Sequence, residues 1–338
     1  MTNLIAELTW RGLLQDIIPG TDEQLQKEMT TGYIGFDPTA DSLHIGNLVP
    51  VILLMHLQKA GHKPIVLVGG ATGMVGDPSG KSAERNMLPI EQINHNIEAQ
   101  KKQLSKFLQF DPSLPNHAEI VNNYDWFQNI TFLDFIRDIG KHITVNYMMS
   151  KDSVQNRLES GMSFTEFSYQ LVQGYDFYYL NQHKNVRLQM GGSDQWGNIV
   201  TGTELIRKKS GNEVFAFTAP LLKKADGGKF GKTEKGNIWL DIQKTSAFEF
   251  YQFWLNSSDE DATKWIKIFT LLDKQTVDEL LSNHQQDASK RILQKKLAEE
   301  VTTFIHGNAA LQEAIETTQK MFANKNASVE SLSEYDLN

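Results

Sequence analysis

A stretch near the N-terminus most strongly constrains the fold of this chain, because it contains two apolar strands on either side of one apolar helix. The strands are expected at residues 32–37 and 64–69, and the helix at residues 48–59. Such a βαβ unit predicts a parallel sheet with a right-handed crossover. In open parallel sheets, ligands bind beyond the carboxyl ends of the strands. Asp37 and Asp77, which follow these strands, are therefore candidate binding residues.

The junction between the first strand and the helix suits an anionic ligand. It contains His44 and Asn47, which are three residues apart and so share one face of the first helical turn. A helix start collects unpaired N–H groups and the positive end of the helix dipole, which favours phosphate. A lone histidine at a helix start is more often structural than catalytic, so His44 alone does not decide the matter.

Two further segments combine glycine with basic side chains. Residues 69–80 are rich in glycine but do not form a Walker A motif, because no Gly-Lys-Ser/Thr follows at the required spacing. Lys81 and Arg85 come after this stretch. In residues 227–233, Lys229, Lys232 and Thr233 alternate with glycines, and two mobile ammonium groups would suit a triphosphate. Taken alone, a solvated basic loop is the more frequent explanation of such a segment.

A polar stripe follows one side of the helix expected at residues 164–177. Tyr169, Gln173 and Asp176 are spaced i, i+4, i+7 and so point to one side. Many such stripes face solvent, but the flanking positions are mostly aromatic or aliphatic and leave little solvated surface. A buried stripe must be hydrogen-bonded by something, and a small polar ligand would satisfy it.

The sequence Gly-Gly-Ser-Asp-Gln at residues 191–195 follows a strand expected at 187–190 and begins a helix that ends near residue 209. Asp194 could accept hydrogen bonds from a ribose diol, while the glycines would let a ligand approach the backbone. The alternative is a glycine turn in which Asp194 is the helix N-cap. The motif alone does not separate the two interpretations.

Length and composition bound the class of protein. A chain of 338 residues favours two domains. It has no cysteine, which excludes disulfides, thiol catalysis and cysteine zinc sites. The net charge of −8 argues against a protein coated with positive charge for nucleic acid, although a local basic patch is compatible with it. Without a signal-peptide pattern or a membrane-length apolar run, the sequence predicts a cytoplasmic enzyme.

Taken together and in this order, the motifs resemble those of the bacterial tyrosyl-tRNA synthetases, a family of class I aminoacyl-tRNA synthetases. The resemblance extends from about residue 10 to about residue 320. It implies an α/β fold in which a Rossmann-like parallel-sheet catalytic domain precedes an α-helical domain. It also implies that the protein activates L-tyrosine with ATP to tyrosyl-adenylate and pyrophosphate, and then transfers tyrosine to the 3′ end of tRNA(Tyr).

The same resemblance divides the chain into four segments. A catalytic domain with a dimer-interface insertion is expected at residues 1–220, and the second signature loop with a linker at 221–245. An α-helical anticodon-side domain is expected at 246–322 and a linker-like tail at 323–338. Residues 1–30 are expected to be helical. A homodimer is implied, and apolar residues 132–139 and 145–149 would suit its interface or, equally, the core.

The resemblance also assigns roles at matching positions. The tyrosine-binding residues would be Tyr33, Asp77, Tyr169, Gln173, Asp176, Gln189 and Gln195. Among these, Tyr33 and Asp176 would bind the phenol, Asp77, Tyr169 and Gln173 the ammonium group, and the two others the region of the carboxylate. The ATP-binding residues would be Gly35, Asp37, Thr39, His44, Gly46, Asn47, Gly192, Asp194, Leu222 and Lys232. The catalytic residues around the phosphates would be Thr39, His44, Asn47, Lys81, Arg85, Lys229, Lys232 and Thr233. The tRNA acceptor end would face Lys151, Trp196, Arg207 and Lys208.

No side chain in this inventory is placed as a nucleophile, so catalysis would come from positioning and charge stabilisation. Mg²⁺ would enter with ATP, held largely by phosphates and water, and no metal held by the protein itself is expected. A membrane partner is not expected.

The sequence departs from the family pattern in three places. Asn47 stands where the class pattern has a second histidine, and its amide could still donate a hydrogen bond. Residues 229–233 are Lys-Phe-Gly-Lys-Thr rather than Lys-Met-Ser-Lys-Ser. Bacterial members usually continue into an S4-type RNA-binding domain, whereas this sequence stops at Asn338, which suggests a truncation that would affect tRNA charging more than adenylate formation.

Two other functions compete with this one. An RNA-binding relative that has lost catalysis would show missing catalytic residues or basic insertions, and neither is evident. The sister tryptophanyl enzyme shares the fold, but Tyr33 with Asp176 favours a phenol over an indole.

Overall fold

The computed structural model describes residues 3–79, 88–155, 161–233 and 236–323. The chain separates into two compact units, which are described in turn. The first consists of Met1–Asp41 and Pro50–Leu221, and the second of Ser42–Val49 and Leu222–Asn338.

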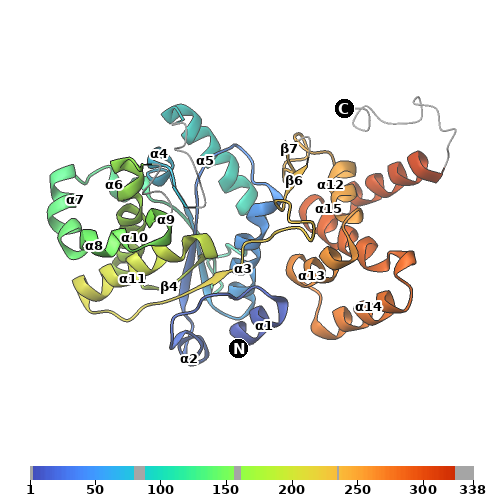
Figure 1. Cartoon of the computed structure of the whole chain (residues 1–338), viewed down its shortest axis with the longest axis horizontal. Helices are drawn as coiled ribbons and strands as arrows, with labels where there is room; N and C mark the ends of the chain where they lie inside the picture. The colour runs from blue at the N-terminus through green and yellow to red at the C-terminus, as the bar shows by residue number, and fades with distance from the viewer. Residues whose placement is uncertain (1–2, 80–87, 156–160, 234–235, 324–338) are drawn as a thin grey trace. The chain divides into compact units, whose positions relative to one another are not determined.

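Five parallel strands form the centre of the first unit (Figure 1). Their order across the sheet is β3-β2-β1-β4-β5. They span Thr31–Phe36 (β1), Lys63–Val68 (β2), Glu119–Asn122 (β3), Val186–Gly192 (β4) and Phe215–Ala219 (β5). The expected parallel sheet is confirmed, and the two strands of the βαβ unit begin and end within one residue of their expected positions.

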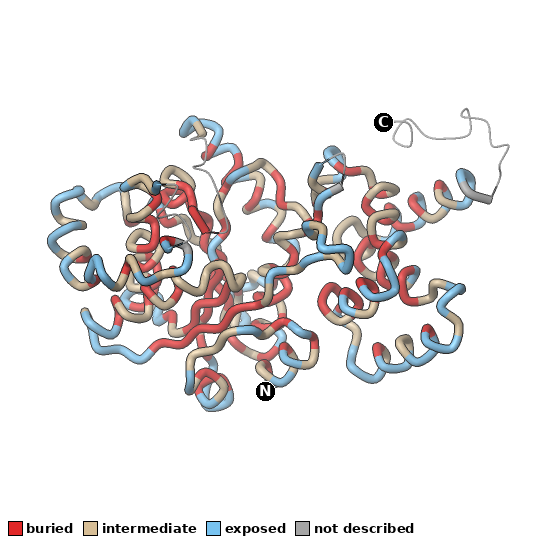
Figure 2. The backbone as a smooth tube through the Cα atoms, in the orientation of Figure 1, coloured by how far each residue is buried: buried red, intermediate tan, exposed pale blue. Residues whose placement is uncertain are grey.

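Burial explains why these segments become strands of a parallel sheet. Every residue of β2 after Lys63 is buried, and so is every residue of β5. Such uninterrupted apolar runs are typical of parallel strands that are covered on both faces. Figure 2 shows the strands as a continuous buried layer inside the first unit.

Helices cover both faces of this sheet. The helices α3 (Leu48–Lys59) and α5 (Ile90–Leu104) lie on one side, and α10 (Phe164–Lys184) and α11 (Trp196–Ser210) on the other (Figure 1). The last two approach closely, since a Cβ atom added to Gly174 would lie 3.4 Å from the Cα atom of Gly202. The remaining helices of this unit are α1 (Leu4–Arg11), α2 (Thr21–Lys27), α4 (Thr72–Val75), α6 (Tyr124–Phe127), α7 (Phe132–Asp138), α8 (Val145–Met149), α9 (Asp152–Gln155) and the 3₁₀ turns η2 (Gly140–His142) and η3 (Ser193–Gln195).

The N-terminal segment corrects one expectation, because residues 1–30 do not form a continuous helix. Gly12 has a left-handed backbone with φ of 75° and ends α1. The chain then runs without a helix to Gly20, and α2 follows. Glycine readily adopts this conformation after a helix, and the apolar periodicity on either side does not reveal it.

The second unit is mainly helical, as expected for residues 246–322. Its helices are α12 (Ala247–Leu255), α13 (Asp259–Phe269), α14 (Lys274–Gln286) and α15 (Ile292–Ala323), with a kink in α15 at Gly307. Ser246, Ser258 and Asp273 cap the first three helices by accepting a backbone N–H. The short elements are η1 (Ile45–Asn47), β6 (Lys232–Thr233), β7 (Gly236–Asn237) and η4 (Ala288–Lys290). Across the described part of the chain, no helix combines the length and apolar character needed to cross a membrane.

Candidate functional site

The strand order of the first unit brings two predicted binding segments to one edge of the sheet. Strands β1 and β4 are neighbours, and the helices that follow them, α3 and α11, cover opposite faces of the sheet (Figure 1). In open parallel sheets, ligands bind at the carboxyl ends of such a pair of strands. Asp37 directly follows β1, while Gly192 ends β4 and Asp194 lies in η3. Gly35 lies within β1 itself. The carboxyl ends of the two neighbouring strands therefore carry carboxylates and glycine backbone.

Asp37 is held in place by two hydroxyl groups. The Tyr169 hydroxyl donates to Asp37 Oδ2 at 3.1 Å, and the Thr72 hydroxyl donates to Asp37 Oδ1 at 2.8 Å. Burial and the nearby carboxylates of Asp37 and Asp77 raise the pKa of Tyr169 well above its usual range. Tyr169 therefore remains a neutral hydrogen-bond donor at physiological pH.

Asp176 is a carboxyl group buried in the middle of α10, with only 2% of its surface exposed. Trp126 Nε1 donates to its Oδ1 at 2.9 Å, and Asn123 Nδ2 donates to its Oδ2 at 3.0 Å. Burial raises the pKa of Asp176 to about 8, although these two hydrogen bonds lower it. Both carboxyl oxygens are thus oriented by neutral donors, and among the described residues no cation forms an ion pair with Asp176 that would offset the cost of its burial.

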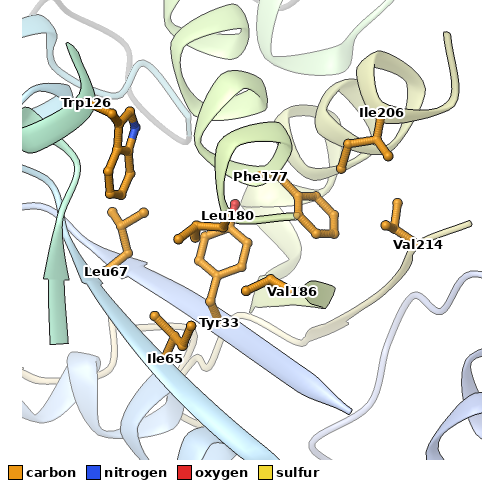
Figure 3. Packing of buried hydrophobic residues seen from close by; sticks show 9 residues of the cluster. All are labelled: Tyr33, Ile65, Leu67, Trp126, Phe177, Leu180, Val186, Ile206 and Val214. Atoms are coloured by element: carbon orange, nitrogen blue, oxygen red, sulfur yellow. The ribbon is translucent and has the colours of Figure 1, made fainter. Parts of the chain in front are cut away.

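Tyr33 lies on β1 with 1% of its surface exposed, and its ring packs in a cluster that includes Ile65, Leu67 and Phe177. Figure 3 shows the ring rising from the strand, with its hydroxyl directed toward α10. The hydroxyl has no hydrogen-bond partner among the described residues. Burial, and next the charge of Asp176, raise the pKa of Tyr33 well above its usual range. A buried hydroxyl without a partner is costly, and a ligand oxygen could satisfy it.

The other predicted tyrosine-site residues form hydrogen bonds of their own. Gln195 Nε2 donates to Asp77 Oδ2 at 2.7 Å, and Asn198 Nδ2 donates to Gln173 Oε1 at 3.0 Å. Gln189 is buried on β4, and its side-chain oxygen has no partner among the described residues. These groups are therefore ordered, with one unsatisfied acceptor among them.

Two of the structural alternatives raised by the sequence are wrong. The polar stripe on α10 does not face solvent, since Tyr169 and Asp176 are buried and Gln173 is half-buried. Asp194 is not a helix N-cap, because Gly192 occupies that position before η3. Burial, and next the carboxylate of Asp77, raise the pKa of Asp194.

The first signature, which consists of residues 44–47 in the second unit, is ordered by its own side chains. The His44 N–H donates to Asn47 Oδ1, and the Gly46 N–H donates to His44 Nδ1, each at 3.0 Å. Because Nδ1 is an acceptor, the neutral imidazole carries its proton on Nε2. Because the Asn47 oxygen is an acceptor, its amide nitrogen is the group that can donate. Both residues thus keep the donor character expected of a phosphate site.

A short backbone segment ties the two signatures together within the second unit. The Ile45 N–H donates to the Ile238 carbonyl at 2.9 Å, and the Leu240 N–H donates to the Leu43 carbonyl at 2.8 Å. On its other side, the Ile238 N–H donates to the Gly231 carbonyl at 3.1 Å. Residues 238–240 therefore bridge the first signature and the loop of the second.

Gly231 explains one departure from the class pattern. Its φ of 81° is a left-handed conformation, and a Cβ atom added there would lie 3.1 Å from Ile45 Cγ1. A serine at this position would be strained and crowded in this structure. On either side of it, Lys229 and Lys232 are exposed.

Several predicted residues are placed without a specific role. Thr39 is exposed and its N–H donates to the Asp37 carbonyl at 2.8 Å, while Leu222 is half-buried at the start of the longer segment of the second unit. Lys81, Arg85 and the side chain of Thr233 lie outside the described residues.

The residues predicted to face tRNA each have neighbours in the first unit. Lys151 Nζ lies 3.6 Å from the centre of the Tyr147 ring, and Trp196 begins α11. Arg207 and Lys208 both pair with Glu204, at 2.8 and 3.1 Å. This shared carboxylate offsets part of their positive charge.

Four residues of this network are absent from the sequence-based assignment, namely Thr72, Asn123, Trp126 and Asn198. Asn123 joins them to the site, since it donates to Thr72 Oγ1 at 3.1 Å as well as to Asp176. It follows β3, so the rule that polar residues gather at strand ends could have found it. Trp126 and Asn198 offer no comparable signal, because they belong to helices and reach the site only through the tertiary fold.

Within the described residues, no group of three or more histidine, cysteine, aspartate or glutamate side chains is arranged to hold a metal ion.

Comparison with known proteins adds a family to this geometry. Residues 25–323 match the family model described as "tRNA synthetases class I (W and Y)". A tyrosine–tRNA ligase of Bacteroides thetaiotaomicron is 60% identical over 99% of this chain and 78% of its own length. One from Flavobacterium johnsoniae is 59% identical over 97% and 77%. The solved structure of a C-terminally truncated Aspergillus nidulans mitochondrial tyrosyl-tRNA synthetase superposes with a TM-score of 0.83, at 29% identity over 95% of both chains.

Proposed function

Since the chain belongs to the class I tRNA synthetases, we propose that it ligates L-tyrosine to tRNA(Tyr). The enzyme is a tyrosine–tRNA ligase in its activity, as are relatives that are 59–60% identical over nearly the whole chain. In the first step, the tyrosine carboxylate attacks the α-phosphorus of ATP. The bond from that phosphorus to the bridging oxygen breaks, and pyrophosphate leaves with the electron pair. In the second step, a terminal ribose hydroxyl of the tRNA attacks the adenylate and releases AMP.

The observation that carries this proposal is the buried pair of Tyr33 and Asp176. A tyrosine phenol can donate a hydrogen bond to a carboxyl oxygen of Asp176 and accept one from the Tyr33 hydroxyl. The hydroxyl of Tyr33 has no other partner among the described residues, and Trp126 and Asn123 already orient the carboxylate. Phenylalanine would leave both groups without a ligand partner, and an indole offers a donor but no comparable acceptor.

The amino-acid end of tyrosine would be held by the remaining polar groups of α10 and its neighbours. Asp77, Tyr169 and Gln173 would bind the ammonium group, while Gln189 and Gln195 would lie around the carboxylate. Asp77 and Tyr169 already engage hydrogen-bond partners in this site, Gln195 and Asp37. Tyrosine binding would therefore replace these hydrogen bonds with hydrogen bonds to the ligand, and the side chains would already be ordered before it binds.

The proposed ATP-binding residues of each unit act through their own chemistry. In the first unit, Asp37, Gly192 and Asp194 would bind the nucleoside. In the second unit, the donors His44 and Asn47 would contact the phosphates, and Lys229 and Lys232 would neutralise the charge that grows on the leaving pyrophosphate. Gly35, Gly46, Thr39, Thr233, Leu222, Lys81 and Arg85 complete the proposed set. Mg²⁺ would accompany ATP, coordinated mainly by phosphate oxygens and water.

The tRNA acceptor end would meet Lys151, Trp196, Arg207 and Lys208 on the first unit. The cytoplasm is the proposed location, because charged tRNA is consumed there in protein synthesis.

We propose a homodimer whose interface includes α7 and α8. Phe132, Leu133 and Val145 are 63%, 75% and 63% exposed, whereas Ile139 and Met148 are buried. The two apolar segments thus use one face for the core and leave another apolar face at the surface. Exposed apolar patches of this kind mark interaction sites. Leu133→Glu should shift the protein from dimer to monomer in light scattering, whereas an unchanged mass would contradict this interface.

Exchange of labelled pyrophosphate into ATP tests the first step directly. Exchange should require tyrosine, and phenylalanine and tryptophan should support it weakly or not at all. Equal exchange with tryptophan would favour the sister specificity. No exchange with any of the three amino acids would overturn the proposed activity.

A further inference from the structure

One aromatic side chain of the second signature loop, Phe230, packs into the helical part of the second unit. The ring of Phe230 stacks on that of Phe269, with 5.1 Å between centroids and 12° between planes. It also contacts the edge of Trp265 at 5.0 Å. Two further rings, those of Phe253 and Trp254, lie 6.0 Å from it. Four rings from α12 and α13 therefore surround this single residue of the loop.

This aromatic cluster is part of the core rather than a surface feature. Trp254, Trp265 and Phe269 are buried, and they also contact one another. Offset-stacked and edge-to-face pairs of this kind fix ring orientation as well as burying apolar area. Phe230 is thus bound to a rigid group of side chains, whereas its neighbours Lys229 and Lys232 are exposed.

The backbone next to Phe230 is also held by residues outside the ring cluster. Gly231 packs against Ile45 of the first signature, and its carbonyl accepts the Ile238 N–H. Lys224 Nζ donates to the Lys232 carbonyl at 3.3 Å and lies over the Phe253 ring. The loop therefore has a fixed centre at residues 230–231 from which two long, flexible ammonium side chains extend.

We propose that Phe230 is a positioning residue for adenylate formation. Through its contacts with the ring cluster, it fixes the position of the backbone at Lys229 and Lys232 relative to His44. A flexible lysine reaches a phosphate with the right geometry only when its backbone is fixed, and small displacements in an active site reduce turnover strongly. This inference rests on the proposed function, in which these lysines stabilise the departing pyrophosphate.

A matched pair of phenylalanine substitutions separates positioning from general stability. Phe230→Leu removes the ring that joins the loop to the cluster. Phe250→Leu is the control, because Phe250 is fully buried in α12 and contacts Trp254 and His306 rather than the loop. Both variants should lower the melting temperature, and the control should lower it at least as much.

In pyrophosphate exchange, Phe230→Leu should lower kcat about ten-fold or more, whereas the dissociation constant for tyrosine should stay within about two-fold. Phe250→Leu should keep kcat within about two-fold of the unaltered protein. Equal kcat losses in the two variants, or an unchanged kcat in Phe230→Leu, would overturn the inference. If the unaltered protein itself shows no tyrosine-dependent exchange, the proposed function fails instead.

Limited trypsin digestion gives a readout that does not depend on activity. Cleavage after Lys229 and Lys232, followed by mass spectrometry, should be faster in Phe230→Leu than in Phe250→Leu, because only the first variant releases the loop from the ring cluster. Equal cleavage rates at these two lysines would contradict an anchoring role for Phe230, whatever the kinetics show.

Discussion

The proposed tyrosine site of the first unit and the signature pair of the second unit are built in opposite ways. Around Asp176 and Tyr33, the functional groups are buried, and neutral side chains such as Trp126 orient them. In the second unit, Lys229 and Lys232 are exposed, and it is the backbone that is fixed, through Gly231 and residues 238–240. In the first region the side chains themselves are held in place. In the second region the backbone is held in place, and the lysine side chains extend from it.

This difference fits the ligand that we propose for each region. A phenol differs from a phenyl ring by one hydroxyl, and only buried partners that would otherwise remain unsatisfied can distinguish the two strongly. Tyrosyl-tRNA synthetase is itself the known example of a site that rejects phenylalanine strongly because its polar groups would be left unpaired. Pyrophosphate is highly charged and must leave, so mobile cations at the surface serve it better. We therefore expect substitutions in the first unit to change tyrosine recognition and those in the second to change turnover.

The largest expected effect is on turnover, from Lys232→Ala. Loss of one cation that stabilises the leaving group should lower kcat for pyrophosphate exchange by roughly 10²- to 10³-fold. Tyrosine affinity, measured by equilibrium binding, should not change. Lys264→Ala is a suitable control, because Lys264 is an exposed residue of α13 that pairs with Glu260. A weakened tyrosine affinity in Lys232→Ala would contradict the proposal that the first unit determines tyrosine recognition and the second determines turnover.

The next effect concerns recognition, from Asp176→Asn. The amide cannot accept as a carboxylate does, and its NH₂ group would oppose Asn123 Nδ2, which now donates to Asp176. We expect kcat/KM for tyrosine to fall by about 10- to 100-fold, with a smaller preference over phenylalanine. Asp125→Asn, at an exposed position of α6, should leave both unchanged. A variant that keeps its full preference for tyrosine over phenylalanine would show that Asp176 does not recognise the phenol hydroxyl.

Tyr33→Phe should have a smaller effect on recognition and the opposite effect on stability. Without the hydroxyl, kcat/KM for tyrosine should fall by about two- to ten-fold, as expected for one neutral hydrogen bond. Because that hydroxyl has no partner among the described residues, its removal should raise the free energy of unfolding by about 1 kcal/mol. Urea denaturation of both proteins checks the second expectation, and a less stable variant would indicate that the hydroxyl is satisfied in the folded protein.

The sequence predicts much of the first region, because its backbone follows from local patterns. The limits of the βαβ unit, the positions of Asp37 and Asp194 at strand ends, and the burial of the stripe on α10 all agree with periodicity and strand-end rules. The partners of Asp176 do not follow from such rules, since Asn123 and Trp126 lie 53 and 50 residues away in the chain. Their contacts depend on how helices pack after the sheet has formed.

In the second region, the motifs are evident in the sequence but their attachment is not. Residues 42–49 group with the second unit, and their backbone pairs with residues 238–240, far along the chain. Long-range backbone pairing leaves no periodicity in either partner. The same holds for Phe230, which looks like an ordinary loop residue until α12 and α13 place four rings around it.

The last expected effect tests burial itself, through the pH dependence of stability. Burial raises the pKa of Asp176 from its ordinary 3.8 to about 8. Between these values, the folded protein keeps a proton that the unfolded chain has released, so stability must fall as the pH rises across this window. The slope that Asp176 adds should be on the order of 1 kcal/mol per pH unit and should vanish below about pH 4 and above about pH 8. Urea denaturation at pH 6 and pH 7.5 measures it as the difference between the unaltered protein and Asp176→Asn, in which other titrating groups cancel. If the two proteins lose stability in parallel, Asp176 is ionised well below pH 6, and the tyrosine site is more polar than its neutral donors indicate.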